Sequence, residues 1–305
     1  MQRLAFVALF LVPAALAAQP AGTLPKSTHL PASTRAMAMG DSYAMTAGHA
    51  DALFYHPSLL TGSGGFGLDF QRWTATSSST AASAAMQWLG GGLGIGLRTL
   101  QYGAPATGAA AAPAGQAHLF DIGPVPVSER IATVGYARSV FGGVDVGASV
   151  DLMDVRVGSS SQNVTLFDLS ASRDLGPVVV GVTAHDIGSK PVVDSGDGPA
   201  AIVLGAGSYG KQIGIFDLGF AANVGVADDE VTYGGGIEIG YWPIQGRTYV
   251  VRLGFDDSME TTDPEASPFT AGLAFWGDNI TVEWAFRPVS DADEGGTHRF
   301  GVRFR

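Results

Sequence analysis

Apolar and polar residues alternate along most of this 305-residue chain, from about Gly65 to its last residue. In the segment 248–256, one face carries only large apolar side chains: Tyr249, Val251, Leu253 and Phe255. Segments of about ten residues with this period of two have the length that a tilted strand needs to cross a bilayer. Bulky apolar residues on one face and small or charged residues on the other are typical of strands that face lipid outward and water inward.

We count about fourteen such segments, which start near Gly65, Thr80, Gly92, Arg130, Val144, Asn163, Val178, Ala200, Ile213, Glu230, Arg247, Pro268, Asn279 and Gly296. Short connections alternate with longer ones, among which we place Gly158–Gln162 and Ala227–Asp229, as expected for short periplasmic turns and longer outer loops. We therefore predict an all-β, transmembrane antiparallel β-barrel of about fourteen strands over residues 63–305. A soluble β-sandwich or solenoid is the alternative, but its outer faces would carry many more Lys and Glu residues.

The strand phase also predicts what lies inside the barrel. It places charges of both signs on the inner face, which suggests salt-bridged walls or anchors for a plug: Asp69, Arg98, Asp145, Asp151, Glu238, Arg252, Glu283, Arg287, Arg299 and Arg303. Gly234, Gly236 and Gly240 on that face would leave room for a plug. Aromatic residues near strand ends predict interface girdles: Trp73, Trp88, Tyr102, Tyr136, Tyr241, Trp242 and Trp276.

The first residues have the pattern of a secretory signal. Arg3 precedes an apolar run from Leu4 to about Ala18, and Ala15-Leu16-Ala17 fits a small-x-small cleavage site. The run is too short for a membrane-spanning helix, although an N-terminal anchor helix is the alternative. We predict a cleaved signal peptide at 1–17 and export of the chain.

Composition narrows the function classes. The chain has no cysteine, which excludes disulfides, Cys-ligated zinc and a thiol nucleophile. Acids outnumber bases by 28 to 17, so no nucleic-acid partner is expected. Only 15% of residues are charged and 46% are hydrophobic. An exported chain of this composition that has no membrane-spanning helices is expected to form either a large soluble β core or a transmembrane barrel.

No catalytic or metal motif stands out. The six histidines show no metal-ligand spacing, so we predict no metal site. There is no Gly-x-Ser-x-Gly, and the strand-borne His185 and His298 have no evident partner, so no enzyme is predicted. Two Gly-x-Gly-x-x-Gly matches, at 62–67 and 205–210, do not open a helix in a βαβ unit, so no nucleotide or other cofactor is predicted.

The segment Ser33–Leu60 does not alternate cleanly. It reads Arg35-Ala-Met-Ala-Met-Gly40-Asp-Ser-Tyr43 and then Asp51-Ala-Leu-Phe-Tyr55-His-Pro57. This order, followed by strands only, resembles the start of the FadL-like outer-membrane barrels, in particular the PorV/PorQ-related branch. The motif residues that carry the resemblance are Arg35, Gly40, Asp51 and Pro57, while His56 stands where the family usually has Asn.

The resemblance implies that residues 18–62 form a plug inside the barrel, although an extension that packs under it is the alternative. It also implies a hydrophobic ligand between plug and wall, for which the candidate residues are Met37, Met39, Tyr43, Met45, Leu53, Phe54 and Tyr55. Three methionines would suit a shape-tolerant pocket, and the alternative is that these residues only anchor the plug.

The expected function is binding or passive transport of small hydrophobic molecules by a monomer in a bacterial outer membrane, in contact with outer-membrane lipid. Two alternatives stay open. One is a PorV-like lipid-binding scaffold for protein secretion and surface attachment, with a secretion-system protein as partner. The other is a purely structural barrel with a sealed lumen.

Overall fold

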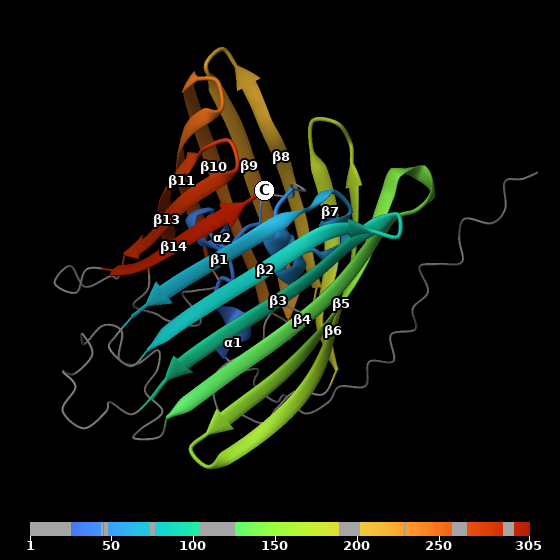
Figure 1. The fold of residues 1–305 in the computed structure, drawn as a ribbon, viewed down its shortest axis with the longest axis vertical. Coiled ribbons are helices and arrows are strands. Elements are labelled where there is room, and N and C mark those ends of the chain that lie inside the picture. The colour runs from blue at the N-terminus through green and yellow to red at the C-terminus, as the bar shows by residue number, and fades with distance from the viewer. Residues whose placement is uncertain are drawn as a thin grey trace, which may run out of the picture.

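The computed structural model of this chain is a closed antiparallel β-barrel of fourteen strands with short helices inside it (Figure 1). It describes residues 26–43, 45, 48–73, 77–103, 126–188, 202–227, 230–257, 267–288 and 296–305. The predicted signal peptide lies outside the described residues. Among the described residues, no helix is long and apolar enough to cross a membrane.

The strands begin within a few residues of the predicted starts, which confirms the fold prediction. They are β1 (Gly65–Arg72), β2 (Ser78–Trp88), β3 (Gly91–Tyr102), β4 (Val127–Ser139), β5 (Val144–Val157), β6 (Ser160–Asp174), β7 (Val179–Gly188), β8 (Ile202–Ile213), β9 (Phe216–Ala227), β10 (Glu230–Ile244), β11 (Arg247–Asp256), β12 (Phe269–Trp276), β13 (Ile280–Pro288) and β14 (Gly296–Phe304). A 3₁₀ turn, η4 (Phe141–Gly143), precedes β5.

Each strand pairs with its neighbours in sequence, and β14 closes the barrel against β1. In that closing ladder Phe304 lies opposite Phe66 and Arg303 opposite Gly67, so both phenylalanines face outward and Arg303 faces inward. The rings of Phe66 and Phe304 lie 6.5 Å apart between centroids. Closure leaves no unpaired sheet edge in lipid, where an unsatisfied backbone group costs several kcal/mol.

We call the barrel end that carries the connection between β3 and β4 the loop end, and the opposite end the turn end. The β5–β6 connection at the loop end is only the two-residue turn Gly158–Ser159, so its assignment as a longer loop was wrong. The ladder continues there from Val157 to Ser160, because polar residues at the end of a strand can pair as well as apolar ones. Only two residues separate Ala227 of β9 from Glu230 of β10, which is also shorter than expected.

The outer wall is apolar and exposed over the whole length of the strands. Ile237, Leu253 and Phe300 are each about half exposed, whereas their neighbours Glu238, Arg252 and Arg299 are buried inside. Such a band is costly in water and favourable in a hydrocarbon layer. The alternation therefore orients every strand, with lipid outside and polar contacts inside.

This orientation gives a first prediction. Ile237→Arg, in the middle of β10 on the outer face, should destabilise the bilayer-inserted barrel by about 2–4 kcal/mol. Val231→Arg, near the loop end of the same strand and equally outward, should cost about 0–1 kcal/mol. Denaturant titration of both variants in phospholipid vesicles measures the difference, and equal losses would contradict a membrane-spanning depth for β10.

Two of the predicted girdle aromatics lie inside the barrel instead. Trp73 and Tyr102 are buried beside Leu100 and Val127. Trp73 continues the inner phase set by Gln71, and Tyr102 donates its hydroxyl to the carboxylate of Glu129 at 2.7 Å. Trp88 and Tyr241 are exposed on the outside, as the prediction required.

The N-terminal segment lies inside the barrel and runs from one end to the other (Figure 1). Its elements are α1 (Lys26–His29), α2 (Thr34–Ala38), η1 (Ala50–Phe54) and η2 (Pro57–Gly62). At the loop end, the backbone N–H of Ser27 donates to Glu129 at 2.8 Å. At the turn end, Thr61 donates to Asp145 at 3.0 Å, and Gln87 donates to two carbonyls of the segment. We call residues 26–64 the plug; the domain boundaries after 17 and 62 stay predictions.

Glycines of the wall let the plug backbone approach closely. A Cβ on Gly254 would lie 2.1 Å from the backbone nitrogen of Gly40, and one on Gly92 would lie 1.8 Å from the carbonyl oxygen of Leu60. Gly234 and Gly236 face the plug in the same way, as predicted. Gly240 does not, because its inner face meets Thr248 and Asp217 of the wall itself.

Candidate functional site

A buried ionic network fixes the plug to the wall, and Arg303 of β14 is its centre. Its guanidinium lies 2.8 Å from Asp51 of the plug, 3.3 Å from Asp69 of β1 and 3.2 Å from Glu283 of β13. It also donates to the hydroxyl of Ser33 in the plug at 2.9 Å. Burial favours the neutral acid, but Arg303, His49, Arg35 and the hydrogen bond from Ser33 together outweigh burial and lower the pKa of Asp51 to about 2.

Arg35 makes the second ionic contact between plug and wall. It donates two hydrogen bonds to Glu238 of β10, at 3.1 and 3.0 Å, in the bidentate geometry that suits a guanidinium. Arg252 of β11 also binds Glu238, at 2.6 Å, and lies 2.9 Å from Glu283, so the two contacts belong to one network. The mixed inner charges therefore do what the pattern predicted, which is to salt-bridge the wall and anchor the plug.

The other two motif residues act through the backbone. Gly40 ends the turn after α2 with φ +67°, pressed against the backbone of Phe255 at a distance that no side chain would fit. Pro57 opens η2, where its fixed φ suits the first helical position. All four motif residues thus lie at places where the plug meets the wall or changes direction.

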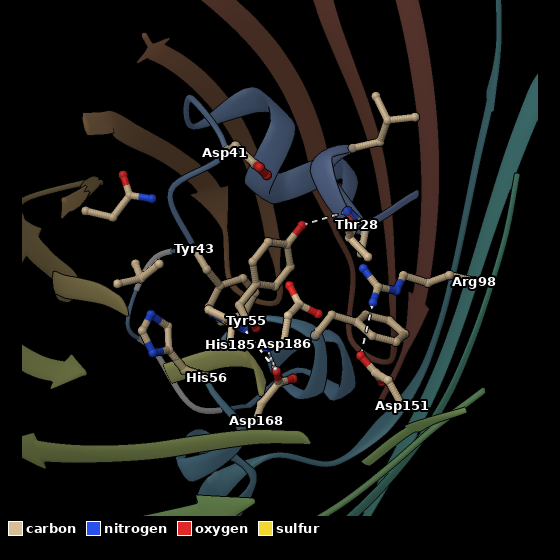
Figure 2. A pocket seen from close by; sticks show the side chains of 15 residues that line it. Thr28, Asp41, Tyr43, Tyr55, His56, Arg98, Asp151, Asp168, His185 and Asp186 are labelled. Carbon is tan, nitrogen blue, oxygen red and sulfur yellow. Dashed lines mark hydrogen bonds and ion pairs between the residues drawn. The ribbon is translucent and has the colours of Figure 1, made fainter. Parts of the chain in front are cut away.

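The seven candidate ligand residues fall into two groups. Met37, Met39, Met45 and Leu53 are almost completely buried. Three of them fill space left by wall glycines: Met39 meets Gly236, Met45 meets Gly181 and Gly207, and Leu53 meets Gly135. Met37 instead clusters with Ala285 of β13. Tyr43, Phe54 and Tyr55 instead line a cavity, together with residues of the opposite wall (Figure 2).

This cavity, which we call the lumen cavity, has a volume of about 140 Å³. Its apolar and aromatic lining comes from Leu30, Tyr43, Phe54, Tyr55 and Val203. The rings of Tyr43 and Tyr55 are stacked, with centroids 5.0 Å apart. The hydroxyl of Tyr55 accepts the backbone N–H groups at 32 and 33, at 2.9 and 3.0 Å, which holds the ring across the lumen.

The opposite lining is acidic. Asp151 of β5 pairs with Arg98 of β3 at 3.4 Å, and Asp168 of β6 lies 3.5 Å from the imidazole of His185. The neighbouring Asp186 has φ +55°, which interrupts the alternation of β7, and both His185 and Asp186 line the cavity. Figure 2 shows these side chains gathered below the two tyrosines.

The prediction that His185 and His298 have no partner was wrong. His185 has Asp168, and His298 accepts a hydrogen bond from the indole of Trp284 at 3.2 Å. Among the described residues, no group of His, Asp and Glu is arranged to hold a metal ion.

Two plug residues at the cavity have unusual protonation. Burial and the nearby His185 lower the pKa of His56 to about 3, and its Nδ1 contacts the hydroxyl of Thr183 on β7. Burial and the neighbouring Asp256 raise the pKa of Asp41 to about 8. The Oδ1 atom of Asp41 is buried and has no hydrogen-bond partner among the described residues.

Sequence reasoning missed Asp41, Asp168, His185 and Asp186 as cavity residues. The inward direction of Asp168 could have been predicted from the sequence, because Leu166 and Ser170 share its phase along β6. The inward direction of Asp186 could not have been predicted, because its left-handed backbone changes the phase of the strand and no glycine marks the position.

Comparison with known proteins places the fold. No family model and no curated protein matches the chain. Among solved structures, a deltaS2 mutant of the monoaromatic hydrocarbon channel TodX is similar with a TM-score of 0.57 and 12% identity, over 90% of this chain and 97% of that one. A FadL homologue of Pseudomonas aeruginosa is similar with a TM-score of 0.55 and 10% identity, over 93% of this chain and 98% of that one. The monoaromatic hydrocarbon channel CymD is similar with a TM-score of 0.52 and 11% identity, over 93% of this chain and 96% of that one. This chain therefore has the fold of FadL-like outer-membrane barrels.

Proposed function

We propose that this barrel of FadL-like fold lies in a bacterial outer membrane and binds small, mainly apolar molecules in the lumen cavity for passage across that membrane. The observation that carries the proposal is the cavity itself, which lies between the plug and the wall and has the stacked rings of Tyr43 and Tyr55 in its lining. Concave sites with aromatic walls and a few placed polar groups are the usual form of a small-molecule site.

The size of the cavity limits the ligand. An apolar cavity of about 150 Å³ in another protein holds benzene, so about 140 Å³ suits a single six-membered ring with a short substituent. The fold relatives TodX and CymD are described as monoaromatic hydrocarbon channels, which agrees with a ligand of one ring.

The position of the cavity suggests a route. Below it, η2 packs against β3, β4, β5 and β6 and fills the lumen toward the turn end. Beside it, Val203 of β8 is part of the lining, so the wall at β8 borders the cavity directly. The proposed route enters from the loop end and leaves sideways through the wall; movement of the plug toward the periplasm is the other route.

The PorV-like scaffold remains an alternative that the relatives described above do not support, since their descriptions name channels and a FadL homologue. A scaffold would need lipid and a secretion-system protein as partners, and no described contact favours either. The lumen cavity is a reason to prefer the channel.

A pair of adjacent substitutions tests the proposal. Val203→Trp fills the lumen cavity from β8 and should abolish saturable binding of 4-fluorotoluene to the refolded barrel, measured by ¹⁹F NMR in detergent. Leu204→Trp adds the same ring on the outer face of the same strand and should leave binding unchanged. Equal binding by both variants would show that the probe partitions into detergent or the outer wall, and would refute the cavity as the site.

A further inference from the structure

The lumen cavity is lined by more carboxyl groups than cationic side chains. Four acidic side chains line it, Asp41, Asp151, Asp168 and Asp186, whereas its cationic side chains are Arg98 and His185. Arg98 forms an ion pair with Asp151, and His185 forms one with Asp168. This leaves two acids at the cavity without a cation at ion-pair distance among the described residues.

Those two acids are placed differently from every acid of the plug anchor. Glu238, Glu283, Asp51 and Asp69 each lie within 3.3 Å of an arginine nitrogen. The carboxylate of Asp186, in contrast, makes no hydrogen bond or ion pair with a described residue; only its backbone N–H is used, by Asp168 at 2.9 Å. Asp41 keeps a buried oxygen without a partner in the same cavity.

A buried carboxylate without a partner is costly, and the cost is relieved by a proton or by a cation. At neutral pH Asp41 takes the first solution, because burial and Asp256 raise its pKa to about 8. A cation in the cavity would provide the second solution for the buried oxygen of Asp41, and it would give the half-buried Asp186 a partner that no described residue supplies. The described carboxylates are not grouped as ligands of a metal ion, which points to an organic cation.

The rest of the lining indicates which kind of molecule would bear the cationic group. Tyr43, Tyr55 and Phe54 provide aromatic surface, and the faces of such rings attract an ammonium group as well as stacking on another ring. The volume admits about one ring with a short arm. Asp186 and the two tyrosines line the same cavity, so one small molecule can place an ammonium at the acid and a ring at the tyrosines (Figure 2).

We propose that the lumen cavity selects small single-ring amines in their protonated form, with the ammonium group at Asp186 and Asp41 and the ring against Tyr43 and Tyr55. This inference rests on the proposed function, because it assigns a ligand class to the same cavity. It narrows that class from neutral hydrophobic molecules to amphipathic cations.

Three single-ring probes of similar size test the ligand class on the unmodified barrel. They are 4-fluorobenzylamine as the cation, 4-fluorotoluene as the neutral form and 4-fluorophenylacetate as the anion, each titrated by ¹⁹F NMR at pH 7. The amine should bind at least about tenfold more tightly than the neutral probe, and the anion more weakly than either. Equal affinity of amine and neutral probe would overturn the inference.

Two variants then locate the ammonium. Asp186→Asn removes the charge but tolerates the left-handed backbone as Asp does, and it should weaken amine binding about tenfold while changing the neutral probe less than about threefold. Asp41→Asn gives an independent second position. Asp154→Asn, whose carboxylate pairs with Arg156 away from the cavity, is the control and should change nothing. Heat-dependent gel mobility confirms that each barrel is folded.

The outcomes separate the two proposals. Binding of the neutral probe that Val203→Trp abolishes, without preference for the amine, supports the proposed function and refutes the amine site. Amine binding that survives both Asp→Asn substitutions refutes the amine site as well. Absence of any binding that depends on Val203 refutes both proposals.

Discussion

Replacing Arg303 with methionine is expected to release the plug from the wall, with a loss of docking free energy of about 3–5 kcal/mol. Methionine keeps much of the side-chain volume but leaves Asp51, Asp69 and Glu283 buried without their shared cation. A loss of this size shifts the docking equilibrium more than a hundredfold. Trypsin cleavage after Arg35, which is buried in the docked plug, should accelerate accordingly in the folded barrel.

The matched control is Arg156→Met. Arg156 also pairs with an aspartate at 2.9 Å, but its side chain is more than half exposed, and exposed pairs contribute about 0–1 kcal/mol. The control should leave the cleavage rate nearly unchanged. Unchanged cleavage in Arg303→Met, with barrel mobility on gels intact, would mean that packing against the wall glycines holds the plug without the ionic network.

The strand pattern predicted the barrel because lipid imposes one rule on every strand. A strand that crosses a bilayer must turn its apolar residues outward, so the period of two in the sequence gives the phase of Phe300 and Arg299 directly. Closure follows, because an open edge would leave backbone groups unsatisfied in lipid. The rule weakens at strand ends, where Gly158 and Ser159 form a tight turn that composition alone could not separate from a loop.

The candidate site was less accessible, because it depends on contacts between segments far apart in the chain. The pattern gave the inward direction of Glu238 and Arg303 but not their plug partners, Arg35 and Asp51, which come from residues without periodic structure. Met39 and Tyr43 were both candidate ligand residues in the sequence, yet Met39 fills the space beside Gly236 of the wall and Tyr43 lines the lumen cavity. Only the path of the plug decides between those positions.

Acidification should loosen the plug through His56, and His56→Asn should remove that part of the effect. The docked pKa of His56 is about 3, below the ordinary value near 6.5, so the docked plug holds the neutral ring. Between pH 6.5 and 3 a released plug binds a proton that the docked plug does not. Docking should therefore weaken as pH falls, by about 1.4 kcal/mol per pH unit from this residue, or about 2 kcal/mol at pH 5.

Other plug groups titrate in the same range, so the comparison with His56→Asn is what isolates the residue. His49, with its pKa lowered to about 3 chiefly by burial, acts in the same direction. Asp41 opposes it, because a pKa of about 8 makes docking more favourable as pH falls from 8 toward 4, and Asp51 contributes only below its ordinary pKa. These three groups are common to both proteins and cancel in the difference.

The difference can be followed as a distance. The chain has no cysteine, so spin labels can be attached to cysteines introduced at Gly62 of the plug and Leu89 of the turn end, both exposed. The label-to-label distance distribution should broaden at a higher pH in the parent than in His56→Asn, where asparagine can still hydrogen-bond to Thr183 without titrating. Identical pH profiles would show that His56 keeps its ordinary pKa when docked, and that water reaches it within the barrel.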